Sequence, residues 1–170
     1  NIDWDVSESI IEFVQGDIVV SASINSNTLF VYKTEYLKNK DCSFKTVISI
    51  NEDTLLIGES EIFIEDFNAL ISGSIVNNDL NLTVQSENQK LSSVINHMPN
   101  KLKEAWQTFI IEGLISYDAE IKGVVSKNKN PSFNMDFNIS DGNFELKEVP
   151  FILNSINTFG KITNGNLNNF

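Results

Sequence analysis

Few side chains in this sequence could carry out nucleophilic or acid–base chemistry. The 170 residues include one histidine, His97, and one cysteine, Cys42. A thiol nucleophile needs a base beside it, and His97 is expected at a helix C-terminus, where a cationic side chain favours the helix dipole. We interpret Cys42 as a small structural thiol. Zinc sites usually combine several Cys and His side chains, so we predict no metal site and no cofactor.

Carboxylates offer a second route to chemistry, either as paired acids and bases or as ligands for a hard cation. Glu59, Glu61, Glu65 and Asp66 gather along one segment. Glu59 and Glu61 fall on the solvated positions of an alternating strand, where charge discourages pairing between sheet edges. The phosphate-binding, nucleophile-elbow, zinc-protease and EF-hand patterns are all missing from the sequence. We therefore predict that the protein is not an enzyme.

The charge balance excludes further classes of protein. The formal net charge is −11 and the pI is about 4.4, which argues against binding to nucleic acid. The sequence contains no run of 18 or more apolar residues, which is the length that a membrane-spanning helix needs. A lone cysteine cannot build a disulfide framework. Because the chain starts at Asn1, we interpret it as a single β-rich segment of a longer protein, with amphipathic strands over 1–65 and a distinct region over 66–170.

The dominant hydrophobic period is two. Apolar and polar residues alternate from Ile115 to Ile121 and again from Phe133 to Ile139. Such alternation is typical of strands with one apolar and one solvated face. Turn residues such as Asn77-Asn78-Asp79 separate neighbouring runs, which favours short hairpin connections. The sequence therefore predicts a mainly β protein built on an antiparallel meander.

One segment has helical spacing instead. Apolar residues recur three and four positions apart at Leu91, Val94, Ile95 and Met98. Ser86 and Gln89 have the spacing of a capping box, and Pro99 would end the helix. We expect a short helix over about 87–98, and a second short helix over Lys101–Trp106. The segment Pro150–Ile156 is interpreted as a further short helix or as a loop crossing an edge.

So many half-apolar strands produce more apolar surface than one short helix can cover. The sheet could pack on a second sheet as a β-sandwich, which general physical considerations favour. It could instead curve strongly into a β-groove whose apolar face accepts a lipid-like ligand. The candidates for lining such a groove are Ile71, Leu80, Leu82, Val84, Ile115, Tyr117, Ile121, Phe133, Met135, Phe137 and Ile139.

The order of elements resembles the C-terminal region of the AsmA-like family. The resemblance covers roughly the last 100 residues and rests on turns, glycines and alternation. The segments that carry it are Leu70–Ile75, Asp79–Val84, Leu91–Met98 with Pro99, Ile111–Gly123, Pro131–Phe137, Asp141-Gly142, Pro150–Leu153 and Thr163–Gly165.

The resemblance implies a function and a location. AsmA-like proteins are membrane-anchored proteins of the Gram-negative cell envelope, tethered to the inner membrane by a helix, with their body in the periplasm. They are similar to repeating β-groove lipid-transfer proteins, and take part in phospholipid transport and outer-membrane biogenesis. We therefore expect a non-enzymatic module whose apolar groove binds phospholipid or acyl chains, and the resemblance favours the groove over the sandwich. A lipid-free β-sandwich that acts as a binding or scaffold domain of the envelope is the alternative.

Overall fold

The computed structural model describes residues 2–14, 17–31, 34–36, 40–97, 103–124 and 131–164. Strands make up most of these residues, with one short α-helix and one 3-10 turn. The elements are β1 (Ile2–Val14), β2 (Asp17–Val31), β3 (Thr34–Tyr36), β4 (Lys40–Asn51), β5 (Thr54–Ile64), β6 (Phe67–Val76), β7 (Asp79–Lys90), α1 (Leu91–His97), η1 (Glu104–Trp106), β8 (Phe109–Val124), β9 (Ser132–Leu146) and β10 (Ile152–Thr163).

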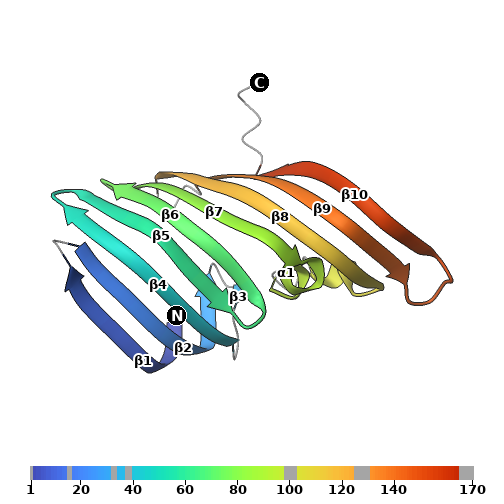
Figure 1. Ribbon diagram of the computed structural model, residues 1–170, viewed down its shortest axis with the longest axis horizontal. Coiled ribbons are helices and arrows are strands. Elements are labelled where there is room, and N and C mark those ends of the chain that lie inside the picture. The colour runs from blue at the N-terminus through green and yellow to red at the C-terminus, as the bar shows by residue number, and fades with distance from the viewer. Residues whose placement is uncertain are drawn as a thin grey trace.

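All ten strands belong to one sheet. Its order is β1-β2-β4-β5-β6-β7-β8-β9-β10, with β3 paired to β2 beside this path. Every pairing is antiparallel between strands that follow one another along the path, so the prediction of a mainly β meander is confirmed. The sheet is open, with β1 and β10 at opposite ends (Figure 1). Within the described residues no second sheet covers it, so the β-sandwich alternative was wrong.

The tight turns between strands explain the meander. Asn77 and Asn78 both have positive φ, 49° and 68°, and they join β6 to β7. Two successive positive φ values define the type I′ hairpin turn, which asparagine tolerates better than most residues. Glu65 has a φ of 53° in the turn between β5 and β6, residues 65 and 66. The prediction of a hairpin at Asn77-Asn78-Asp79 is confirmed.

The helix is shorter than the sequence pattern predicts. Strand β7 continues to Lys90, which pairs with Leu114, and α1 begins only at Leu91. Ser86 is not an N-cap, because its hydroxyl donates instead to the carbonyl of Asn68 at 3.0 Å. A register shift between Ser86 and Gln89 lets β7 keep its pairing with β8 beyond that point. Cross-strand pairing therefore replaces the predicted first turn of the helix, residues 87–90.

The two other short helices considered from the sequence, over Lys101–Trp106 and Pro150–Ile156, also differ from the structure. Of the predicted helix Lys101–Trp106, the described part contains the 3-10 turn η1 over Glu104–Trp106. The segment Pro150–Ile156 is not a helix, since β10 begins at Ile152 and pairs with β9. Met98 and Pro99 lie outside the described residues. No helix within the described residues has the length and apolar content needed to cross a membrane.

The buried core is small and lies under α1. Leu91 and Ile95 of the helix pack against Ile111 and Ile115 of β8. Leu91 is 5% exposed and Ile95 is 8% exposed. Burying each of these side chains contributes about 1.5–3 kcal/mol, which is enough to hold a helix of two turns that would not form alone.

Candidate functional site

The eleven predicted groove residues lie on one face of the sheet, which we call the apolar face. Residues directly opposite one another in an antiparallel ladder share a face. Ile71 is opposite Val84, and Val84 is opposite Ala119. The pairing registers of β6, β7, β8 and β9 place the remaining candidates on this same face. They are Leu80, Leu82, Ile115, Tyr117, Ile121, Phe133, Met135, Phe137 and Ile139.

Helix α1 divides this set of residues in two. Four of them belong to the core under the helix: Ile115, Tyr117, Phe137 and Ile139. The other seven lie outside that cluster and are half-buried by their neighbours in the sheet. They are Ile71, Leu80, Leu82, Val84, Ile121, Phe133 and Met135. We call these seven residues the open patch.

The apolar face extends beyond the open patch towards the N-terminal strands. Ile18 of β2 is opposite Ile48 of β4, and Ile48 is opposite Ile57 of β5. Ile57 is in turn opposite Gly73 of β6, which is opposite Leu82 of the open patch. The described structure therefore carries one continuous apolar surface from β2 to β9, and α1 covers one end of it.

A large hollow, however, lies over the opposite, polar face. It has a volume of about 680 Å³, and its lining includes Glu61, Asp118 and Asp136 together with the exposed side chains of Phe63 and Leu70. Of the eleven predicted residues, only Tyr117 and Phe137 reach it. Phe63 and Leu70 occupy positions where alternation expects polar residues, and this irregularity is the sequence signal for the hollow.

Polar contacts organise this hollow. Gln85 donates from Nε2 to Asp118 Oδ2 at 2.6 Å, and Lys161 lies 3.5 Å from Asp136 Oδ2. Burial raises the pKa of the Tyr117 phenol, while a hydrogen bond with Ser86 acts in the opposite direction. Tyr117 is therefore a neutral, hydrogen-bonded member of the apolar face and not an ionised group.

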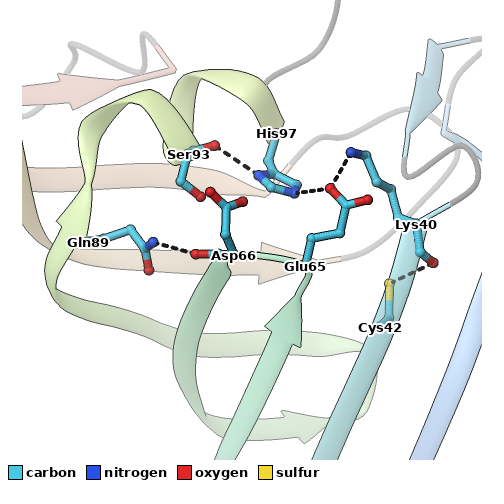
Figure 2. Close-up of polar contacts among 7 residues, drawn as sticks. All are labelled: Lys40, Cys42, Glu65, Asp66, Gln89, Ser93 and His97. Carbon is cyan, nitrogen blue, oxygen red and sulfur yellow. Dashed lines mark hydrogen bonds and ion pairs between the residues drawn. The ribbon is translucent and has the colours of Figure 1, made fainter. Parts of the chain in front are cut away.

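Three of the residues first considered for chemistry lie together at a second place in the structure. Glu59 and Glu61 are exposed strand residues, as predicted. Glu65 and Asp66 instead form the β5–β6 turn, where their carboxylates lie beside His97 at the end of α1 (Figure 2). One ligand atom from each of these three residues lies within 4.8 Å of the other two. We call Glu65, Asp66 and His97 the turn cluster.

The turn cluster is held by a buried amide. Gln89, 6% exposed, donates from Nε2 to the carbonyl of Asp66 at 2.8 Å. Its Oε1 accepts the backbone N–H of Asn68 at 3.0 Å. The backbone N–H of Glu65 donates to the carbonyl of Asp41 at 3.0 Å. The turn is therefore fixed from β7 on one side and from β4 on the other.

Lys40 and Cys42 lie next to the turn cluster. Lys40 forms an ion pair with Glu65 (Figure 2). Burial raises the pKa of the Cys42 thiol above its ordinary value of 9.0; the carboxylates of Asp41 and Glu65 add to this rise, and Lys40 opposes it. A thiol held protonated in this way is a poor nucleophile.

Comparison of the chain with protein-family models, with curated proteins and with solved structures found no significant match. A functional assignment for this chain therefore depends on the physical properties of the apolar face and of the turn cluster.

Proposed function

We propose that this chain is a non-enzymatic lipid-handling module whose apolar face binds acyl chains. The observation that carries the proposal is the open patch: seven apolar side chains from four adjacent strands, contiguous with Ile57 and Ile48, that the helix does not cover. Soluble proteins rarely leave a contiguous apolar surface of this kind without a ligand or partner.

The energetics suit a long hydrocarbon chain. Each methylene group moved from water to an apolar surface contributes about 0.8 kcal/mol, so a dozen methylenes offset the cost of immobilising the chain. The polar face and the net charge of −11 keep the remainder of the molecule hydrated. A lipid head group would stay at the sheet margin, in water, while its acyl chains cover the open patch.

The resemblance to AsmA-like proteins supports the wider setting of this proposal. By that resemblance the module acts in the periplasm of a Gram-negative bacterium, in phospholipid transport and outer-membrane biogenesis. The intact protein would then be tethered to the inner membrane by a helix outside this segment. The single open sheet is the architecture that such a role requires, because a closed sandwich would leave no apolar face for a lipid.

Two adjacent residues of β7 provide a matched test. Leu82 belongs to the open patch, whereas Thr83 points to the polar face. Leu82→Glu should weaken the binding of a fluorescent fatty acid by about tenfold or more, because it places a charge against the acyl chain. Thr83→Glu adds the same charge and should leave the affinity unchanged. Circular dichroism of both variants verifies that the sheet has formed.

Mass spectrometry of lipid extracted from the purified wild-type chain gives the second measurement. We expect stoichiometric phospholipid from the wild type and less from Leu82→Glu. A lipid-free wild type that fails to bind the fluorescent fatty acid would overturn the proposal.

One observation favours a second candidate, a lipid-free scaffold domain. The end strands β1 and β10 carry strongly exposed apolar side chains, including Phe13 at 80% and Phe159 at 86%. A scaffold would use these edges to join protein partners by strand pairing. In that case the open patch would be covered by protein, and neither lipid nor a fatty acid would be found on it.

A further inference from the structure

The imidazole of His97 is oriented by the helix that carries it. Its Nδ1 lies 2.8 Å from the backbone carbonyl oxygen of Ser93, one turn earlier in α1. A carbonyl can only accept a hydrogen bond, so Nδ1 carries the hydrogen. In the neutral ring the lone pair is therefore on Nε2. An N–H donated to a backbone carbonyl is the usual way in which proteins orient a metal-binding histidine.

The Nε2 atom is buried and faces the carboxylate of Glu65 (Figure 2). The His97 side chain is 7% exposed, and Nε2 has no hydrogen-bond partner among the described residues. The second such atom in the described part of the chain is Ser93 Oγ, on the preceding turn of the same helix. Buried polar atoms without partners are uncommon, and an unpaired imidazole nitrogen that faces a carboxylate indicates a site for a further group.

The distance from Nε2 to the nearest carboxylate oxygen does not match a hydrogen bond. His97 Nε2 and Glu65 Oε2 are 3.7 Å apart, beyond the range of N–H···O bonds. Two ligand atoms about 2.0–2.1 Å from a tetrahedral zinc ion are about 3.4 Å from each other. The observed separation is thus close to that of two ligands on one metal ion.

The carboxylates of Glu65 and Asp66 lie where they could bind the same ion as His97. Glu65 and Asp66 are exposed, so their carboxylates can each move by about an ångström without disturbing the core. Their backbone is held in place by bonds to Gln89 and Asp41. The Phe67 ring packs against the His97 ring, with centroids 5.6 Å apart and the planes tilted by 38°, and limits how far the imidazole can turn. Two exposed carboxylates therefore lie beside an imidazole whose orientation is fixed.

We propose that Glu65, Asp66 and His97 bind a divalent transition-metal ion of the zinc class. One imidazole nitrogen and two carboxylate oxygens suit such an ion, with water completing the coordination. The ion would link the β5–β6 turn to the end of α1 and hold the helix over the apolar face. This site is independent of the lipid proposal and contradicts the expectation drawn from the counts of Cys and His.

Titration of the tag-free chain with Zn²⁺, and with Co²⁺ as a spectroscopic probe, tests the site. We expect one equivalent of either ion to bind, and the imidazole NMR signals to shift at Nε2. Because the chain has one histidine, those signals belong to His97 alone. Bound Zn²⁺ should also raise the melting temperature, since it binds the folded chain in preference to the unfolded one.

Three substitutions distinguish a built site from loose binding to surface acids. His97→Ala and Asp66→Asn should each weaken Zn²⁺ binding by about tenfold or more. Asp66 is exposed, so Asp66→Asn remains informative even if loss of the imidazole disturbs α1. Glu59→Gln removes one carboxylate from the same segment, outside the cluster, and should leave the affinity unchanged.

Lys40→Met should change the affinity for Zn²⁺ in the opposite direction. It frees Glu65 from its ion pair and should tighten Zn²⁺ binding. The proposal is overturned if Zn²⁺ and Co²⁺ fail to bind at millimolar concentration. It is also overturned if they bind without affecting the histidine signals, or with equal affinity to the wild type and the Asp66→Asn variant.

Discussion

The side-chain amide of Gln89 donates a hydrogen bond of 2.8 Å to the backbone carbonyl of Asp66. This bond links the end of β7 to the turn between β5 and β6, residues 23 positions apart in the sequence. Gln89 also accepts a bond from the N–H of Asn68, so both halves of its amide are used. Gln89, which the sequence pattern places at the start of a helix, is therefore a clamp: its side chain links β7 to the β5–β6 turn.

Loss of this clamp should reduce stability. Gln89→Ala leaves the carbonyl of Asp66 and the N–H of Asn68 without their partner in a partly buried place. We expect the free energy of unfolding, measured by urea denaturation, to fall by about 1–3 kcal/mol. The matched control is Gln85→Ala, because Gln85 is exposed and its bond to Asp118 lies at the surface. Equal losses in the two variants would contradict the role assigned to Gln89.

Gly73 should not tolerate a side chain. Its φ is 152°, and a Cβ there would lie 2.9 Å from Leu82 Cα and would also collide with the carbonyl of Asn81. Backbone strain and overpacking each cost about 1–3 kcal/mol, so Gly73→Ala should lose about 2–6 kcal/mol of unfolding free energy.

Gly123 separates those two causes. It has a φ of 126°, but among the described residues a Cβ there would approach no atom closer than Pro131 Cα at 3.6 Å. Gly123→Ala should therefore show the strain alone and lose less stability than Gly73→Ala. If the order of the two losses is reversed, the close approach of β6 and β7 is not the limiting contact.

The Cys42 thiol should react slowly with disulfide reagents. Burial and the carboxylates of Asp41 and Glu65 raise its pKa above 9.0, so its rate profile should have a midpoint above that pH. Glu65→Gln should move the midpoint down, and Lys40→Met should move it up. Measurements in the presence of a chelator keep metal binding out of the comparison. Shifts of the same sign in both variants would contradict the electrostatic origin.

The same raised pKa makes stability depend on alkaline pH. The folded state keeps the Cys42 proton where the unfolded state has lost it, so this contribution is present below pH 9.0. It is lost as the pH rises from there through the higher pKa of the folded state. Cys42→Ser should flatten this part of the curve of unfolding free energy against pH.

The edge strand β10 should promote self-association. Phe159 is 86% exposed and Ile162 is 46% exposed, on a strand that pairs only with β9 in the described structure. Phe159→Lys removes an apolar side chain worth about 1.5–3 kcal/mol on burial, so association measured by analytical ultracentrifugation should weaken about 10–100-fold. Asn154→Lys adds the same charge to β10 without removing an aromatic ring and should have a smaller effect.

Local patterns predicted much of the fold. Alternation identified the strands around Ile115–Ile121 and Phe133–Ile139, because a pleated strand turns successive side chains to opposite faces. The Asn77-Asn78 turn followed from the left-handed conformations that asparagine adopts readily. The segment Ser86–Lys90 was misassigned, since its capping pattern is local whereas its pairing with β8 is not.

By itself, the sequence determined which side chains share a face, because the period of two is a property of each strand alone. It also determined the acidic charge balance, which depends on composition and not on folding. Only the tertiary structure decided that the strands form one open sheet, since pairing order depends on contacts between distant segments. It likewise brought His97 to Glu65 and Asp66, which lie about 30 residues away and meet only because β6 and β7 return the chain to the same end of the sheet.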